Sequence, residues 1–169
     1  AGVCEADINV GIATATDNCG VASVVSNHPS TIYPVGTTVV TWTATDIHGN
    51  TSTCTQTIVV TDDEAPVITC PANISVSNDA NACNATVIVP IPVTTDNCAV
   101  ASVVNDYNGG GADASASYPV GITTVTYLVT DIHGNTATCS ITVEVIDDEN
   151  PEITCPADIT QTADASVCE

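Results

Sequence analysis

The chain has 169 residues, of which 20 are Asp or Glu and none is Lys or Arg, so its formal net charge is -20. Binding to nucleic acids or to anionic membrane surfaces rests on basic side chains, and the composition argues against both. Carboxylates that come together in this chain must be solvated, protonated or neutralised by an ion from outside, and a divalent cation is the simplest such ion. The alternative is an acidic surface that only keeps the protein soluble.

The remaining composition predicts the kind of core and the setting. Hydrophobic residues make up 44% of the chain, with neither Phe nor Met, and Val, Ile, Ala and Thr are abundant. β-Branched residues favour strands. Nine cysteines in so short a chain favour an oxidising, extracellular or cell-surface location. No apolar run reaches the length of a membrane span, so we expect no membrane insertion.

The sequence contains one unit twice. Thr45-Asp-Ile-His-Gly-Asn50 returns as 130–135, and the acidic run Asp62-Asp-Glu-Ala-Pro66 returns, with one change, as 147–151, both 85 residues later. A fixed period of this size predicts a tandem array, and such arrays usually form stalks, fibres or scaffolds.

In chain order, the predicted elements are strands and turns. A Tyr-Pro-Val-Gly turn at 33–36 precedes a strand over 38–45, whose residues Val40, Trp42 and Ala44 share one face, and the His-Gly-Asn sequence that follows predicts a hairpin turn. The same order returns over 118–135, and alternating residues then predict a strand over 141–145. These patterns indicate half-buried antiparallel strands.

One insertion distinguishes the two units. The second unit has six extra residues between Cys98 and Tyr118, and the segment from Asn105 to Ser117 contains three consecutive glycines. It predicts a long, mobile surface loop.

The chain is out of phase with its own repeat. The last five residues, 165–169, restate the first five, and the first unit lacks the opening strand that the second unit has at 67–80. Either the chain is a window of a longer array, or its last twenty residues insert as a donor strand into a neighbouring copy. The repeated end sequence slightly favours the window, and both alternatives predict a polymer of copies or further repeats.

The motifs also carry a family resemblance. Five motifs follow one another in an order that resembles the hyalin repeat (HYR) domain. They are Thr-Asp-Asn-Cys, Tyr-Pro-Val-Gly, Thr-Asp-Ile-His-Gly-Asn-Thr-(Ser/Ala)-Thr-Cys, Asp-Asp-Glu-X-Pro and Ile-Thr-Cys-Pro-Ala. The resemblance, with about seven short strands in each unit, implies an all-β protein of tandem immunoglobulin-like sandwiches. We expect an HYR-like domain at 1–64 without its first strand, a complete one at 65–149, and the first strand of a third, or a donor strand, at 150–169.

The acidic runs predict a calcium site between the two domains. Three segments should meet at one junction: the linker after the first domain, the turn after the second strand of the second domain, and the last hairpin of the second domain. Oxygen ligands from three loops suit Ca²⁺ better than Mg²⁺, which demands tight octahedral geometry. The predicted ligands are Asp62, Asp63, Glu64, Asp96, Asn97, Asp131 and Asn135.

The repeat implies incomplete copies of this site at both ends. Asp17, Asn18, Asp46 and Asn50 would await a preceding acidic linker, and Asp147, Asp148 and Glu149 would await a following domain. The alternative is a solvated linker with ordinary Asx turns.

Four cysteines in each repeat allow three connectivities. Proximity at one end of the sandwich predicts the pairs Cys19–Cys54 and Cys98–Cys139. Closeness in sequence suggests Cys70–Cys83 and Cys155–Cys168, although a straight strand would hold those sulfurs too far apart. Cys4 then has no partner within the chain.

Catalysis has little support in the sequence. His48 and His133 occupy equivalent turn positions, and no serine lies in a Gly-X-Ser-X-Gly motif, so we expect no enzyme. Asn50, Asn73 and Asn84 match the N-glycosylation pattern, which has low specificity.

These observations lead to one functional hypothesis and an alternative. The first is a structural subunit of an extracellular filament or surface stalk, made of calcium-stiffened, disulfide-stapled sandwiches. The alternative is an adhesin, a binding module whose 105–117 loop or exposed edge strands recognise a carbohydrate or a protein.

Overall fold

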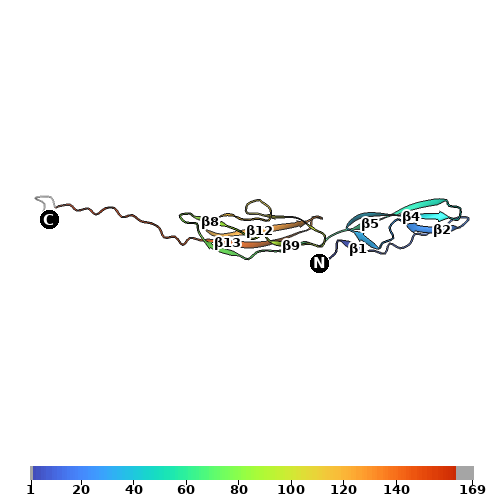
Figure 1. Ribbon diagram of the computed structural model, residues 1–169, viewed down its shortest axis with the longest axis horizontal. Coiled ribbons are helices and arrows are strands. Elements are labelled where there is room, and N and C mark those ends of the chain that lie inside the picture. Colours follow the sequence, from blue (N-terminus) through green and yellow to red (C-terminus); the bar gives the residue numbers. More distant parts are fainter. Residues whose placement is uncertain (1, 163–169) are drawn as a thin grey trace.

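The computed structural model describes residues 2–162. Its strands form two sandwiches that follow one another along the long axis, and an extended tail leaves the far end of the second (Figure 1). No helix in the described span is long and apolar enough to cross a membrane.

The first repeat contains five strands and is built around one long hairpin. The strand bounds are β1 (Glu5–Asp7), β2 (Val21–Ser26), β3 (Ile32–Pro34), β4 (Gly36–Asp46) and β5 (Thr51–Val60). β4 and β5 pair along nearly their whole length, and β2 adds to the other edge of β4. β1 pairs with β3 in a separate small sheet.

The second repeat has eight strands. They are β6 (Val67–Thr69), β7 (Ile74–Ser77), β8 (Asn84–Val87), β9 (Val93–Thr95), β10 (Val100–Asn105), β11 (Ala116–Pro119), β12 (Gly121–Asp131) and β13 (Thr136–Ile146). One sheet has the order β10-β12-β13-β7, in which β7 runs parallel to β13. The pairs β6-β9 and β8-β11 form the opposite layer.

The two repeats share a hairpin with the same register. Trp42 lies opposite Cys54 in the first hairpin, and Tyr127 lies opposite Cys139 in the second. This equivalence confirms the prediction of tandem all-β sandwiches. Within residues 2–60, no strand corresponds to β6 or β7 of the second repeat.

The hydrophobic core is concentrated in the second repeat. Alternate residues of β12 and β13 point inward, as the period of two requires, and they pack against Val and Ala from β8 and against Tyr118. The core members are Ala85, Val87, Val89, Ala114, Tyr118, Val125, Tyr127, Ile141, Val143 and Val145. Among the apolar residues that the structure describes in the first repeat, only Tyr33 and Val40 are fully buried. The same sequence pattern therefore gives a closed sandwich in one repeat and an open one in the other.

The inserted loop is tied down by side chains. The buried Asn105 amide donates to the carbonyl oxygens of Gly111 (3.0 Å) and Asp113 (3.2 Å), and its oxygen accepts the backbone N–H of Tyr107. The ring of Tyr107 stacks on Tyr118 with 4.1 Å between ring centroids. The long loop thus has an internal scaffold that its glycine content did not predict.

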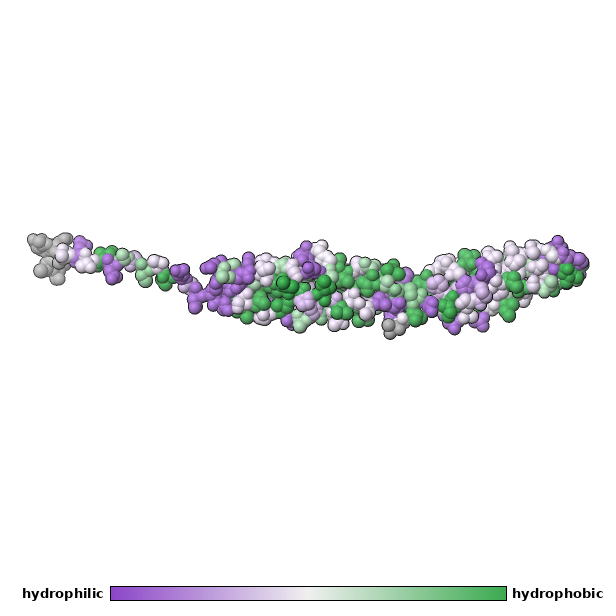
Figure 2. Space-filling model, in the orientation of Figure 1, coloured by the Kyte–Doolittle hydropathy of each residue, from purple (hydrophilic) through white to green (hydrophobic). Residues whose placement is uncertain are grey.

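Polarity is uneven along the visible face. Hydrophilic residues gather where the tail leaves the second repeat, and apolar residues occupy the middle of that repeat (Figure 2). The end that carries the second acidic run is therefore the more polar end of the second sandwich.

Candidate functional site at the junction

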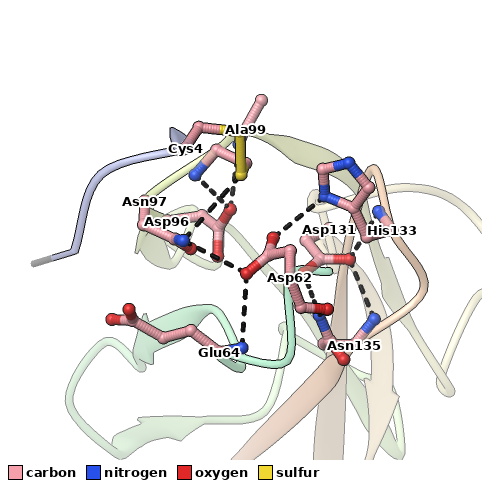
Figure 3. Close-up of polar contacts among 10 residues, drawn as sticks. Cys4, Asp62, Glu64, Asp96, Asn97, Ala99, Asp131, His133 and Asn135 are labelled. Carbon is pink, nitrogen blue, oxygen red and sulfur yellow. Dashed lines mark hydrogen bonds and ion pairs between the residues drawn. A yellow bond between two sulfur atoms is a disulfide. The ribbon is translucent and has the colours of Figure 1, made fainter. Parts of the chain in front are cut away.

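Three segments of chain meet where the first repeat joins the second. The linker 61–66 contributes Asp62, the turn after β9 contributes Asp96 and Asn97, and the hairpin between β12 and β13 contributes the stretch from Asp131 to Asn135 (Figure 3). The antiparallel β12–β13 hairpin and the β9–β10 turn both end at this side of the sandwich. The fold therefore brings together segments that are far apart in sequence.

Asp131 organises the hairpin turn. One carboxylate oxygen accepts the backbone N–H groups of His133 and Asn135, each at 2.8 Å, and the other accepts the Asn135 side-chain amide at 2.8 Å. Gly134 in this turn has a φ of 94°, which a residue without a Cβ adopts without strain. The Asp131 residue is only 2% exposed. Burial acts to raise the pKa of Asp131, but the hydrogen bonds from Asn135, His133 and Gly134 bring it below its ordinary value.

Asp96 organises the turn before β10. Its Oδ1 accepts the backbone N–H groups of Cys98 and Ala99, both at 2.9 Å. Its other oxygen, Oδ2, is buried and has no hydrogen-bond partner, and the same is true of Oδ1 of Asn97. Two buried oxygens at this junction therefore have unused acceptor capacity, which is costly unless a donor or a cation meets them.

Asp62 connects the linker to both turns. Its Oδ1 accepts the Asn97 amide at 3.1 Å, and its Oδ2 lies 2.9 Å from Nδ1 of His133. Its backbone carbonyl accepts the Asn135 amide at 3.2 Å. The side chain is 2% exposed. The hydrogen bond from Asn97 and the neighbouring His133 lower the pKa of Asp62, which is therefore ionised at neutral pH.

Asp62, Asp96 and Asp131 form what we call the carboxylate cluster: an oxygen of each lies within 4.8 Å of the others. Three carboxylates at this separation repel one another, and His133 is the one neighbouring side chain that can carry a positive charge. The cluster, with the free oxygens of Asp96 and Asn97, offers a hard cation oxygen ligands from both repeats. Cys98 also lies near Asp62 and His133, but its sulfur is in a disulfide and has no thiolate to offer.

Two of the seven predicted ligands do not join the other five at the junction. Asp63 is exposed, as expected for a neighbour of a buried residue in an extended linker. Glu64 is also exposed; its backbone N–H donates to Asp62, and its carboxylate points away from the other acidic groups (Figure 3). The other five, Asp62, Asp96, Asn97, Asp131 and Asn135, lie together.

His133 is the residue that the sequence reasoning missed. Its presence in both repeats, as His48 and His133, led to its interpretation as a turn residue. A histidine next to an Asp-Asn turn that faces an acidic linker was the available signal.

The half-sites have the local geometry of the junction but lack its second face. Asp17 accepts the N–H groups of Cys19 and Gly20, as Asp96 does for its own turn. Asp46 accepts the N–H groups of His48 and Asn50 and the Asn50 amide at 2.7 Å, as Asp131 does. Asn18 lies beside Asp17 in the exposed turn.

At the other end, the acidic residues contact their own repeat. Asp148 accepts the Ser77 hydroxyl at 2.7 Å, Glu149 accepts the Asn81 N–H at 2.8 Å, and Asp147 accepts the Glu149 N–H. The half-site residues are exposed except for the half-buried Asp46, and within residues 2–162 no second domain faces the carboxylate of Asp147, the equivalent of Asp62.

A disulfide crosses the junction, and its partners correct two predictions. Cys4 bonds to Cys98 with an S–S distance of 2.03 Å, so Cys4 is not left over and Cys98 does not pair with Cys139. The prediction failed because the Asp96 turn places Cys98 against the start of the first repeat, 4.6 Å from Cys4 between Cα atoms. The disulfide therefore links the two repeats covalently.

The second disulfide corrects a third prediction. Cys70 bonds to Cys139, and not to Cys83, because Cys139 faces the core from β13 and Cys70 packs against the same core after β6. β7 then carries the chain away from Cys70 before Cys83. Cys19 and Cys54 are both exposed and unbonded, so the predicted Cys19–Cys54 pair is also wrong. The expected Cys155–Cys168 pair involves a residue outside the described part of the chain.

The three asparagines with the glycosylation pattern differ in their surroundings. Asn50 uses its amide nitrogen to bond Asp46, which opposes attachment of a sugar there. Asn73 and Asn84 are exposed, and the Asn73 oxygen accepts the Thr142 N–H. Glycosylation of these two stays a prediction.

Comparison with known proteins identifies the repeat. The family model of the HYR domain matches residues 2–60 and 61–145. Hyalin of Lytechinus variegatus is 36% identical over 158 residues, and hyalin of Strongylocentrotus purpuratus is 40% identical over 156 residues. A mouse protein with sushi, von Willebrand factor type A, EGF and pentraxin domains is 32% identical over 148 residues.

These matches cover most of this chain but little of the relatives. The alignments span 89%, 88% and 83% of the chain, and 29%, 13% and 4% of the respective relatives. The extracellular cadherin domains 1–4 of protocadherin gamma B7 match 79% of the chain and 41% of that structure, with a TM-score of 0.37 and 17% identity.

Proposed function

Because the chain belongs to the HYR domain family, we propose that it is a structural segment of an extracellular filament or surface stalk whose successive sandwiches are stiffened by Ca²⁺ at their junctions. The observation that carries this proposal is the carboxylate cluster. Its members come from the linker of one repeat and the turns of the next, so an ion bound there holds both.

Calcium fits the donor set better than other common ions. Ca²⁺ takes six to eight oxygens in flexible geometry, and the junction supplies carboxylate, amide and carbonyl oxygens. The unpaired oxygens of Asp96 and Asn97 are available without breaking any hydrogen bond. Zinc prefers nitrogen and sulfur ligands, and the cluster offers one imidazole and no thiolate.

The disulfide and the ion would act together on the same joint. Cys4–Cys98 limits how far the repeats can separate, and an ion at the carboxylate cluster limits how they can rotate. Without the ion, three carboxylates repel one another across a short linker. The array would then bend at each junction and be straight with calcium bound.

An extracellular location is part of the proposal. Two disulfides in the described residues are stable in an oxidising environment. The similarity to hyalin supports a repeat protein outside the cell.

Calorimetric titration of Ca²⁺ tests the site, with a matched pair of variants. Asp62 and Asp147 occupy equivalent linker positions, but only Asp62 faces a second domain. We expect the Asp62→Asn variant to lose the tightest site and Asp147→Asn to keep it. Equal binding by both variants, or no binding by the unchanged chain, would contradict the calcium site.

A binding role for the 105–117 loop is the second candidate function. The loop occurs in one repeat only, and the contacts of Asn105 and the Tyr107–Tyr118 stack hold it in one shape. A preorganised surface loop is suited to recognising a carbohydrate or a protein. A glycan array with the unchanged chain and a loop-shortened variant tests it; binding that survives shortening would contradict this role.

A further inference from the structure

The first repeat has an open core face at positions that are closed in the second. Trp42 and Ala44 on β4 are half-buried, whereas their equivalents Tyr127 and Val129 on β12 are fully buried. On the neighbouring strand β5, Ile58 is half-buried, while its equivalent Val143 is fully buried. The sequence pattern is the same, so the difference lies in what covers the face.

In the second repeat that cover is the segment from β6 to β7. β6 pairs with β9, β7 runs parallel to β13, and Cys70 bonds to Cys139. Ile68, Cys70 and Ile74 of this segment pack against the core.

The first repeat has a groove at the corresponding place. It has a volume of about 450 Å³, and its lining includes Thr14, Ala15, Thr16, Trp42, Ala44 and Cys54. Residues 14–16 are the equivalents of β9, the strand that pairs with β6, and Cys54 is the equivalent of Cys139. The groove therefore presents both the edge and the cysteine that the covering segment uses in the second repeat.

The tail carries the sequence of a covering segment. Asn150-Pro-Glu-Ile-Thr-Cys-Pro-Ala157 matches Ala65-Pro-Val-Ile-Thr-Cys-Pro-Ala72, and Ile159 is the equivalent of Ile74. Ile153 is 85% exposed and Ile159 is 90% exposed. Through residue 162 the tail is extended, forms no strand pairing and stands clear of both sandwiches (Figure 1). The tail therefore exposes apolar side chains of the kind that would cover the open groove of the first repeat.

We propose that residues 152–162 of one copy dock into the open groove of the first repeat of a second copy. Residues 152–154 pair antiparallel with 14–16, and residues 159–162 run parallel to residues 58–61, along the free edge of β5 and the residue that follows it. Ile153 and Ile159 fill the places that Ile68 and Ile74 fill in the second repeat. This is strand addition between copies, and it names the partner in the proposed filament without depending on calcium.

The unbonded cysteines support the same arrangement. Cys54 and Cys155 are equivalent to the bonded pair Cys139 and Cys70, and Cys19 and Cys83 are equivalent to Cys98 and Cys4. All four are exposed and unbonded in the single copy. Docking places Cys155 against Cys54 of the second copy and Cys83 against Cys19 of the second copy, so each contact between copies acquires equivalents of both Cys70–Cys139 and Cys4–Cys98.

Each such disulfide is a two-electron oxidation. Two thiols lose two protons and two electrons as the S–S bond forms, and a small-molecule disulfide is reduced to two thiols in exchange. Because the same pair of surfaces meets head to tail, the contact does not close on itself and gives an open filament.

Disulfide mapping tests the docking directly. The reduced chain is reoxidised with oxidised glutathione, with chelator and physiological salt present so that bound calcium has no part and surface repulsion is screened. We expect a ladder of covalent oligomers whose peptides contain Cys54–Cys155 and Cys19–Cys83. A monomeric product, or oligomers with other pairings among the described cysteines, would overturn the proposal.

A fluorescence experiment tests the groove without relying on disulfides. Trp42 is the single tryptophan and lines the groove, so its emission should shift to shorter wavelength when the groove is covered. The reduced Ile153→Asp chain cannot dock its own tail, and a synthetic peptide of residues 150–162 should bind to it and restore the shift.

The control variant is Ile91→Asp, at an exposed position outside both docking surfaces. We expect Ile153→Asp to weaken oligomer formation at least about tenfold and Ile91→Asp to leave it unchanged. Equal effects of the two variants would overturn the proposal. Peptide binding without any cross-link between copies would overturn the choice of a second copy and assign the groove to a neighbouring repeat of the same chain.

Discussion

Nδ1 of His133 lies 2.9 Å from Oδ2 of Asp62, and this contact joins the linker of the first repeat to a hairpin of the second. Asp62 also accepts the amide of Asn97 from another turn of the second repeat. One linker carboxylate is thus held by two turns of the following domain, so the protonation of that carboxylate should govern the order of the junction.

Acid should destabilise the junction. The pKa of Asp62 and that of Asp131 are lowered in the folded chain, so both groups hold fewer protons when folded than when unfolded near their ordinary value of 3.8. Their contribution to stability is present above that value and is lost as the pH falls through the lower folded pKa. We expect the melting temperature of the calcium-free chain to decrease once the pH is lowered past about 4. Asp62→Asn should show a shallower fall; an identical pH profile for both proteins would contradict the role of Asp62.

The two disulfides should have different effects when they are removed. Cys70–Cys139 closes a separation of 69 residues within the second sandwich, so the Cys70→Ser/Cys139→Ser variant should lose about 2 to 5 kcal/mol of stability. Cys4–Cys98 spans two domains, so Cys4→Ser/Cys98→Ser should leave the denaturant midpoint of the second repeat nearly unchanged. Small-angle scattering of this second variant in chelator should show a wider range of domain orientations. Equal losses of stability in the two variants would contradict the division between core and junction.

Asn105 should stabilise the inserted loop. Its buried side chain donates to carbonyl oxygens and accepts the N–H groups of Tyr107 and Asn108, so Asn105→Ala removes several hydrogen bonds to the backbone of the loop. We expect a loss of about 2 kcal/mol or more in denaturant unfolding. Asn84→Ala, at an exposed position on β8, is the control and should change stability by less than about 0.5 kcal/mol. A similar loss in both variants would show that the Asn105 contacts do not stabilise the loop.

Asp96 should contribute to calcium affinity through its free oxygen. Asp96→Asn keeps the size of the side chain but replaces a charged acceptor, so calcium should bind at least about tenfold more weakly. Asp17 is the equivalent residue at the exposed half-site and forms the same turn hydrogen bonds. Asp17→Asn should leave the tightest calcium site unchanged. An equal loss of calcium affinity in both variants would indicate that calcium is attracted by the overall negative charge and not by a specific site.

The sequence was informative where local pattern and repeat period decide the structure. Alternating residues identified the β4–β5 and β12–β13 hairpins, and the period placed Asp62, Asp96 and Asp131 on segments that the structure brings together. An immunoglobulin-like topology is enough to make those three segments meet.

Pairings that depend on the path of a single strand could not be predicted. The partner of Cys70 is set by how the opening segment crosses from one sheet to the other between β6 and β7. The partner of Cys4 is set by contact between two repeats, which periodicity within a repeat does not describe. The orientation of Glu64 is likewise a detail of the linker: a regular extended strand would place Glu64 on the same side as Asp62, but residues 61–66 do not form a regular strand.

An anomalous difference map of crystals grown with calcium tests the central claim most directly. The account predicts one peak among Asp62, Asp96 and Asp131, with ligand oxygens at about 2.3 to 2.6 Å, including the carboxylate oxygen of Asp96 that lacks a hydrogen bond. A map with no peak there, with the three carboxylates separated by water, would contradict it.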